Sequence, residues 1–430
     1  MGRDLLVLLE MIQNKKLILL GPQTSALPIN QSPLYYYLIF PIYLISGQSF
    51  LSANLTLAFI YLSLFLFNLY QYRHHQTYIC SLLISFFLLS IHPQYILQGR
   101  FVWNPSFLTP FLITAILSFF QLLQKFNYRY LLISTISLAV SLSLSYSIAP
   151  ITIAILIFCL FSNQKIFVKY IICFFSFLSF INLPVIVYQM KKLIISGTFI
   201  SSNQINQISH NYFDKIDAFK NYVLASGNPI IDNFLLIGLI ILTVFSFRSK
   251  NNLSKYLASL LIITLLITIL SPFNLQAHYI FALTTCIFLL IGSLNLKNSF
   301  LIILLLTILY LSPQKLTAYF QSSPRTYREM NTCFQKYCQQ HPENTYVSVQ
   351  SNLYPYHYGP EHRYLMKLNS CHVKHIETEN NQANFMAVVL DSSTFSDQTK
   401  YYELDLFGKH KQISTFNCLP NLQIVTLEKI

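Results

Sequence analysis

The chain has 430 residues, of which 54% are hydrophobic and only 10% are charged, and its formal net charge is +13. Average proteins carry about 25% charged residues, so this composition excludes an ordinary soluble domain. Apolar runs close to the ~20 residues that cross a bilayer recur between residues 52 and 313. The fold class expected is therefore a multi-pass α-helical membrane protein. Retention of basic residues on the cytoplasmic side explains the positive charge without nucleic acid as a partner.

The first expected domain, residues 1–50, holds two helices that do not span. Residues 4–20 mix leucines with polar side chains and predict a helix on the membrane surface that ends at Gly21-Pro22. A second apolar piece, Leu34–Ile45, follows Pro33 and is too short to cross a bilayer. We expect it to be interfacial or re-entrant.

The second expected domain, residues 51–313, is a bundle of about ten membrane spans. Their approximate bounds are 52–70, 78–95, 107–124, 130–146, 148–163, 166–187, 233–247, 254–270, 277–294 and 298–313. Short loops on one side of these spans hold nine basic residues, and those on the other side hold one, Arg100. The positive-inside rule then places the N-terminal stretch and the chain after residue 313 outside the cytoplasmic membrane. Because Met1 starts on the outer side, we expect a further span upstream of it.

The third expected domain, residues 314–430, is a small extracytoplasmic α/β domain. A helix is expected over Arg325–Gln340, and stretches rich in Val, Ile and Thr predict strands over Thr345–Gln350, His372–Glu377, Phe385–Leu390 and Leu422–Lys429. Four cysteines lie here, Cys333, Cys338, Cys371 and Cys418. They allow three pairings, and whether they form disulfides depends on the compartment. The cysteine spacing lacks a second matching pair, so no metal-ligating residues are expected.

Carboxylates are scarce before residue 314, which makes the acids of the opening stretch candidates for chemistry. Asp4 is the candidate catalytic residue, with a favourable place at the positive end of a helix dipole as the alternative. Glu10 is six residues further on, about 240° round an α-helix, so the two cannot act as a pair from one face. Glu10 is a candidate substrate-binding residue.

The candidate ligands of an anionic substrate are basic or polar residues on the expected outer side. Lys15 and Lys16 suit a lipid phosphate, although any surface helix carries such lysines at headgroup depth. Arg100 suits a phosphate or sugar, and an interfacial anchor beside the chain's single Trp is the alternative. Asn104 lies in the same stretch, and His278 lies at the outer end of a span, where a structural role is the alternative.

Three short motifs carry a resemblance to a known family. They are Gly2-Arg3-Asp4, Leu20-Gly21-Pro22-Gln23-Thr24-Ser25 and Ser32-Pro33-Leu34-Tyr35-Tyr36-Tyr37-Leu38. Together they resemble the first outer loop of integral-membrane glycosyltransferases of the GT-C fold, which include dolichyl-phosphate-mannose–protein mannosyltransferases and aminoarabinose transferases of lipid A. The Arg100–Pro105 stretch and His278-Tyr279 are similar to bacterial members. Family members usually carry a span, and often a further acid, before this loop, and this sequence has neither.

The resemblance implies a glycosyltransferase that moves a sugar from a polyprenyl-phosphate donor to an acceptor lipid, glycan or protein at the outer face of the membrane. It implies that Asp4 acts as the base or orients a divalent metal ion. Glu10, Lys15, Lys16, Arg100, Asn104 and His278 are then expected to bind substrate. Two alternatives remain open. One is a lipid-sugar transporter or flippase, disfavoured because the spans lack charge, and the other is a degenerate transferase.

Overall fold

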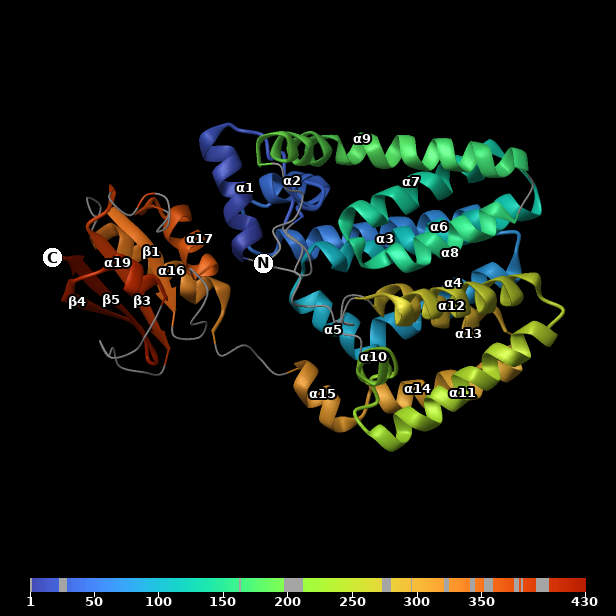
Figure 1. Ribbon diagram of the computed structural model, residues 1–430. Helices are drawn as coiled ribbons and strands as arrows, with labels where there is room; N and C mark the ends of the chain where they lie inside the picture. The colour runs from blue at the N-terminus through green and yellow to red at the C-terminus, as the bar shows by residue number, and fades with distance from the viewer. Residues whose placement is uncertain are drawn as a thin grey trace. The chain divides into compact units, whose positions relative to one another are not determined.

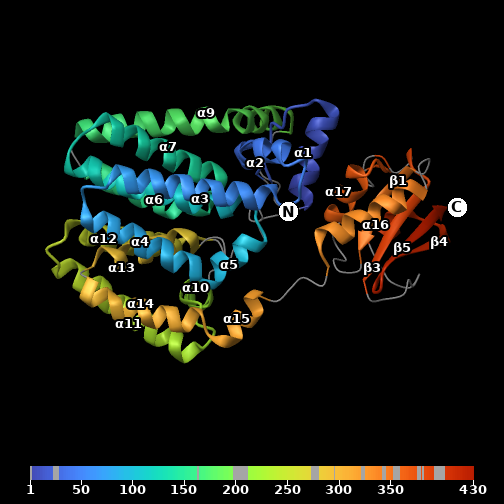
Figure 2. The ribbon, with the colours of Figure 1, turned by 180° about the vertical axis from the view of Figure 1, so that it is seen from behind.

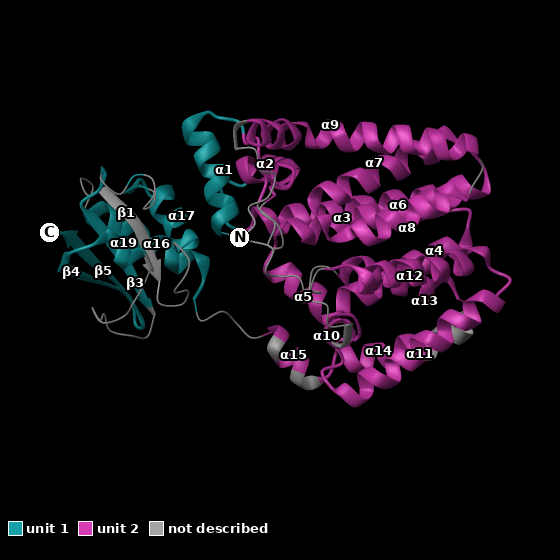
Figure 3. Cartoon of the chain, in the orientation of Figure 1, with its two compact units in different colours: residues 1–17, 46–50, 322–430 teal, residues 18–45, 51–321 magenta. Residues whose placement is uncertain are grey.

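The protein, for which we have a computed structural model, falls into two compact units. The structure describes residues 2–22, 29–161, 164–196, 212–272, 280–294, 296–320, 325–340, 345–351, 359–374, 379, 382–391 and 402–430. Unit 1 consists of residues 1–17, 46–50 and 322–430, and unit 2 consists of residues 18–45 and 51–321 (Figure 3). The two ends of the expected first domain thus cluster with the C-terminal residues, and its middle clusters with the helices.

The secondary-structure elements that the structure describes in unit 2 are all helices, joined by turns and irregular segments (Figures 1 and 2). Its first helices are α2 (Leu34–Ile45), α3 (Ser52–Gln71), α4 (Gln76–Ile91), α5 (Pro93–Arg100), the 3-10 turn η1 (Asn104–Phe107), α6 (Leu108–Gln124), α7 (Tyr128–Leu144) and η2 (Tyr146–Ile148). The later ones are α8 (Ala149–Leu160), α9 (Gln164–Ser196), α10 (Tyr212–Phe219), the π-helical η4 (Lys220–Leu224), α11 (Pro229–Arg248), α12 (Asn252–Leu270), α13 (Phe281–Ser293), α14 (Leu296–Tyr310) and α15 (Pro313–Phe320).

Several of these helices are long and apolar enough to cross a membrane. Within the described residues, five pass by length and composition, and a sixth if α4 and α5 count as one bent span. Four shorter apolar helices accompany them. Only 22% of the apolar window of α9 is buried, so most of its apolar side chains face outward, as expected of a helix in lipid. The chain is a multi-pass membrane protein, and the count of ten spans stays a prediction.

The expected span 78–95 is broken in the structure. Helix α4 ends at Ile91 and α5 begins at Pro93, and their axes differ by 68°. His92 between them has an extended backbone, which the following proline favours because its ring disfavours the helical region for the residue before it. The His92 ring then caps α5 by accepting a hydrogen bond from the Gln94 amide at Nδ1. The expected span ran through this break, because the apolar run on which it was based continues up to residue 91.

Polar side chains within unit 2 find partners inside the bundle. The amide of Asn68 in α3 donates to Thr114 Oγ1 in α6 at 2.8 Å, and Ser81 Oγ in α4 donates to the Leu289 carbonyl in α13 at 2.8 Å. A Cβ on Gly292 would lie 2.7 Å from the Ser81 backbone, so glycine permits this close approach of α13 to α4. Small residues and internal hydrogen bonds are what hold helices together in lipid.

Unit 1 contains a mixed five-stranded sheet with helices. Its elements are α1 (Gly2–Asn14), α16 (Tyr327–Gln340), β1 (Thr345–Ser351), α17 (Pro360–Leu368), β2 (His372–Val373), β3 (Phe385–Asp391), α19 (Tyr402–Phe407), β4 (His410–Leu419) and β5 (Leu422–Lys429). The strand order is β2-β1-β3-β5-β4, with β1 parallel to β2 and β3 and the other pairs antiparallel. A small α/β domain was expected here, but β4, α17 and α19 were not.

Segments from three parts of the chain build unit 1. Helix α1 packs on α17 through a stripe of leucines, of which Leu5 and Leu8 are fully buried. The 46–50 segment is attached by Phe50, whose ring stacks on Tyr327 with centroids 5.4 Å apart. Tyr364 donates a hydrogen bond to the Gln48 carbonyl. The N-terminal helix is therefore a structural part of the C-terminal domain.

Two disulfides join the four cysteines of unit 1. Cys333 pairs with Cys418 and links α16 to β4, and Cys338 pairs with Cys371 and links α16 to the chain that follows α17. This is one of the three pairings that the sequence left open.

A buried acid lies in α19 of unit 1. The Glu403 side chain is fully buried, and neither carboxylate oxygen has a hydrogen-bond partner among the described residues. Burial penalises the charged form and raises the pKa of Glu403 to about 7. The carboxyl is therefore protonated in the folded protein at pH values where it is ionised in the unfolded chain.

We expect the stability of unit 1 to fall as the pH rises from about 4.5 to about 7, because only the folded state then holds the Glu403 proton. The expected loss is on the order of 3 kcal/mol. Glu403→Gln should abolish most of this dependence and leave unit 1 more stable at pH 8. Hydrogen exchange of the β3 and β5 amides at pH 5 and pH 8, corrected for intrinsic rates, measures it. Glu428→Gln, which alters an acid paired with Lys411, is the control and should keep the wild-type profile.

Candidate functional site

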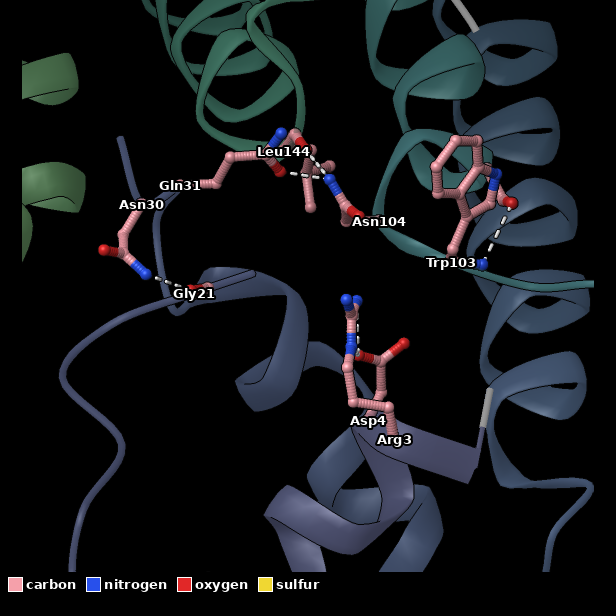
Figure 4. A network of polar contacts seen from close by, with 9 residues as sticks. Arg3, Asp4, Gly21, Asn30, Gln31, Trp103, Asn104 and Leu144 are labelled. Carbon is pink, nitrogen blue, oxygen red and sulfur yellow. Dashed lines mark hydrogen bonds and ion pairs between the residues drawn. The ribbon is translucent and has the colours of Figure 1, made fainter. Parts of the chain in front are cut away.

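Asp4 lies in the first turn of α1 and is almost completely buried. Its relative exposure is 2%. The guanidinium of Arg3 donates to Asp4 Oδ1 from Nε at 3.2 Å and from Nη2 at 3.1 Å (Figure 4). The Arg3 side chain is itself 58% exposed. A fixed carboxylate beside an accessible cation suits acid–base chemistry on an anionic substrate.

Glycine precedes this pair for a packing reason. A Cβ on Gly2 would lie 2.5 Å from the Glu361 Cα, at the start of α17. Only glycine therefore allows the beginning of α1 to approach the α17 backbone this closely. The Gly2-Arg3-Asp4 motif thus combines a close helix contact with a positioned charge pair.

Glu10 faces a different direction from Asp4, as the helical period predicts, and bridges to α17. Lys367 Nζ lies 2.5 Å from Glu10 Oε1, and Arg363 Nη2 lies 4.0 Å from the same oxygen. Arg363 is buried, and the Lys367 side chain is only 17% exposed. These partners could not be predicted from the sequence, because they lie more than 350 residues away from Glu10.

Lys15 and Lys16 end α1. The expected helix 4–20 stops at Asn14 because Lys15 adopts a left-handed backbone with φ 51°. The Lys16 amide donates to the Met11 carbonyl and the Lys15 amide donates to the Ile12 carbonyl, which is a Schellman cap. Both side chains are exposed. Their positive charges interact favourably with the negative end of the helix dipole. Both side chains can still contact solvent or lipid headgroups.

Arg100 occupies the last turn of α5 in unit 2 and is exposed. The chain after it is fixed by Gln98, whose Oε1 accepts from Trp103 Nε1 at 2.7 Å and from Ser106 Oγ at 2.6 Å. The Gly99 carbonyl accepts from Asn54 in α3. Arg100 therefore projects from a rigid turn.

Asn104 is buried in a hydrogen-bonded network of unit 2. Its Nδ2 donates to the Leu144 carbonyl at 2.8 Å and to Gln31 Oε1 (Figure 4). The Gln31 backbone in turn pairs with residues 21–22, since the Gly21 amide donates to the Gln31 carbonyl at 2.9 Å. Asn104 thus holds Gln31, and through its backbone Gly21 and Pro22, against the end of α7.

The predicted site residues fall into the two units. Asp4, Glu10, Lys15 and Lys16 belong to unit 1, whereas Arg100 and Asn104 belong to unit 2. Of these, Glu10 is brought together with cations that the sequence did not identify. His278 lies outside the described residues.

An apolar groove runs along α11, α13 and α14 of unit 2. It encloses about 890 Å³ and is lined mostly by aliphatic and aromatic side chains. Gly238 lies in its wall, and a Cβ there would meet nothing within 4 Å. One end is lined by Arg248, and Val223, Leu224 and Tyr310 belong to the lining as well. Such a groove can take part of a long hydrocarbon chain.

Charged side chains gather beside Tyr310. Lys315 Nζ donates to the Ala225 carbonyl at 2.6 Å and lies 5.7 Å from the centre of the Tyr310 ring. Burial lowers the pKa of Lys315, and the charge of nearby Asp232 opposes this shift. Asp232 is buried and accepts from the Ser226 amide at 3.0 Å. Neither Asp232 nor Lys315 stands in a recognisable sequence motif.

A divalent metal ion, which the resemblance allows, needs several ligating side chains close together. The part of the chain that the structure describes contains no group of three or more His, Cys, Asp or Glu side chains able to hold a metal ion. The partner of the Asp4 carboxylate is the Arg3 guanidinium, a cation that competes with a metal. These residues therefore do not fit a metal site.

The fold is similar to that of a solved membrane protein. The crystal structure of ArnT from Cupriavidus metallidurans bound to undecaprenyl phosphate matches 100% of this chain and 93% of its own, with a TM-score of 0.61 and 11% sequence identity. The chain has a GT-C-like fold. At this identity the two proteins share the fold alone. No protein-family model matches the sequence, and no curated protein matches it.

A GT-C-like fold is what the short motifs indicated. The match extends over the whole chain and so includes both units. The particular family within that fold stays a prediction, and so do the roles of the site residues.

Proposed function

We propose that the chain transfers a sugar from a polyprenyl-phosphate donor to a hydroxyl or amine of an acceptor at the outer face of the cytoplasmic membrane. The observation that carries this proposal is the whole-chain similarity to ArnT, whose crystal structure contains undecaprenyl phosphate. The apolar groove, the exposed cations and the buried Asp4 supply the parts that such a reaction needs.

In the proposed reaction, the acceptor oxygen or nitrogen bonds to the anomeric carbon as the bond between that carbon and the phosphate oxygen breaks. Asp4 takes the acceptor proton, and Arg3 keeps its carboxylate in place. Polyprenyl phosphate leaves with the electron pair, and cations stabilise its growing charge. Arg100, with Lys15 or Lys16, is proposed for that role.

The remaining candidates receive supporting roles. Lys315 is a further proposed phosphate ligand, because it lies against Tyr310 of the groove. Asn104 is proposed to position Gln31, in keeping with its buried hydrogen bonds. Glu10 is proposed to hold Lys367 and Arg363 in place. His278 is retained as a proposed substrate ligand.

The two disulfides support an extracytoplasmic place for unit 1. Structural disulfides persist in oxidising compartments and are rare in the cytosol. The same side was expected from the basic residues of the short loops. Labelling of a cysteine introduced at exposed Ile430 with a membrane-impermeant maleimide, in intact cells, tests this placement.

We expect Gly238→Phe to raise the KM for a polyprenyl-phosphate sugar about tenfold or more. A Cβ at Gly238 meets nothing within 4 Å, so the larger side chain has room at its base and takes up space in the groove that the lipid would occupy. Tenfold corresponds to about 1.4 kcal/mol of lost binding. Initial rates with a radiolabelled donor in detergent micelles measure it.

The matched control is Ile240→Phe, on the same helix. Ile240 is 58% exposed and does not line the groove, so the larger ring should leave the KM unchanged. An equal effect of both substitutions, or of neither, would contradict the assignment of the groove to the donor tail. Absence of transfer by the wild-type protein with any polyprenyl-phosphate sugar and envelope acceptors would contradict the proposed function itself.

A further inference from the structure

A polar pocket lies within unit 1 between α1 and α17, apart from Asp4. It encloses about 720 Å³ and is lined by eleven described residues, which come from α1, from α17 and from the positions 370–374 and 379. This volume falls in the range that holds small ligands, about 300–1,000 Å³. In the proposed transfer reaction Glu10 only holds Arg363 and Lys367 in place, and no substrate is assigned to this pocket.

The lining has the composition of a site for a hydroxyl-rich ligand. Of the eleven residues, only Val373 and the disulfide-bonded Cys371 are apolar, and none is aromatic except His372. Gln13 and Asn14 contribute planar amides from the end of α1. Amides and charged groups form paired hydrogen bonds with adjacent sugar hydroxyls, whereas an apolar ligand would leave them unsatisfied.

Charge in the pocket favours an anion. Three cationic side chains, Arg363, Lys367 and Lys374, line it against two carboxylates, Glu10 and Glu379. Lys374 pairs with Glu379 at 3.7 Å, near the surface. Arg363 and Lys367 are more deeply buried, and both approach the single oxygen Glu10 Oε1. Because charge-assisted hydrogen bonds are strongest where water is excluded, this inner pair is the strongest anchor for an oxyanion.

The Glu10 carboxylate occupies the position that an incoming oxyanion would take. It is held by Lys367 at 2.5 Å, and its side chain is 35% exposed, so it can move aside into solvent. The Cys338–Cys371 disulfide and the left-handed Ser370 fix the opposite wall. The pocket therefore has a rigid cationic floor behind an internal carboxylate that competes with a ligand.

We propose that the pocket between α1 and α17 binds an anionic saccharide, one that bears a phosphate or a carboxylate. The oxyanion contacts Lys367 and Arg363 in place of Glu10, and the sugar hydroxyls contact the amides of Gln13 and Asn14. This site goes beyond the proposed transfer reaction and does not depend on it.

Isothermal titration of the full-length protein in detergent, without donor lipid, tests the proposal. Glucose 1-phosphate and glucuronate are expected to bind saturably, and glucose is expected to bind at least tenfold more weakly. Inorganic phosphate should bind several-fold more weakly than glucose 1-phosphate if the pocket recognises the saccharide. Phosphate that binds as tightly as glucose 1-phosphate would indicate a site for any oxyanion and would overturn the saccharide assignment. Binding of neither anionic sugar, or equal binding of glucose, would overturn the proposal.

Two substitutions assign the binding to this pocket. Lys367→Met should weaken binding of glucose 1-phosphate about tenfold, whereas Glu10→Gln should strengthen it several-fold because the competing charge is removed. A merely structural ion pair would give the same loss for both. Lys411→Met, which breaks a comparable pair with Glu428 in β4 and β5, is the control and should leave binding unchanged. Retained affinity in Lys367→Met would exclude this pocket. Since no transfer is measured, failure here leaves the proposed function standing.

Discussion

Replacing Asp4 with asparagine is expected to reduce the rate of sugar transfer about 10²- to 10⁴-fold, the usual contribution of a general base. Asparagine keeps the shape of the side chain and can still accept a hydrogen bond from Arg3 at Oδ1. It cannot take up a proton from the acceptor. Single-turnover transfer from a preformed complex with labelled polyprenyl-phosphate sugar measures the chemical step directly.

The control for this prediction is Asp217→Asn, since Asp217 is an exposed acid in α10 that pairs with Lys220 at 3.2 Å. It should retain the wild-type rate. Because Asp4 is buried, the thermal midpoint of Asp4→Asn must also be compared with that of the wild type, so that loss of folding is not mistaken for loss of chemistry. A folded Asp4→Asn protein with an undiminished rate would remove Asp4 from the reaction.

Removing the Cys338–Cys371 disulfide by substituting both cysteines with alanine should lower the stability of unit 1 by about 3–4 kcal/mol. The bridge closes a loop with a sequence separation of 33, and the chain-entropy model gives this value for such a loop. The loop contains β1 and α17, so the loss reaches the helix on which α1 packs. Hydrogen exchange of the β3 amides, near the centre of the sheet, measures it in the full-length protein.

Reduction of the wild-type protein tests the same bond without a substitution and should lower protection of β3 at least as much, because both bridges then open. Cys80→Ala is the control, since Cys80 is a free cysteine in α4 of unit 2. It should leave unit 1 unaffected. Unchanged exchange in the double alanine variant would show that the bridge does not stabilise the fold.

The sequence predicted those parts of the fold that depend on local composition. Each apolar run that was expected to span coincides with a helix between α3 and α14. Such runs predict helices because a helix in lipid must satisfy its own backbone hydrogen bonds and cover them with apolar side chains. Helix α2 was expected over Leu34–Ile45, and the structure has the same bounds. In unit 1, the Val- and Ile-rich β3 and β5 were found because both are largely buried.

Features set by distant contacts were not predicted. Strand β4 is an edge strand with polar residues such as Lys411 and Asn417, so it lacks the apolar alternation of a half-buried strand. The ion pairs of Glu10 depend on the packing of α1 against α17, which no local pattern encodes. The disulfide pairing likewise depends on the path of the chain between the cysteines.

One compact unit contains residues 1–17, 46–50 and 322–430. This limits how often the chain between these segments can cross the membrane. A single water-exposed body cannot lie on both faces of a bilayer. The chain from residue 18 to residue 45 is then expected to leave and return on the same face, so α2 is expected not to cross the membrane. The chain from residue 51 to residue 321 is likewise expected to cross an even number of times. The ten spans expected from the sequence meet this requirement.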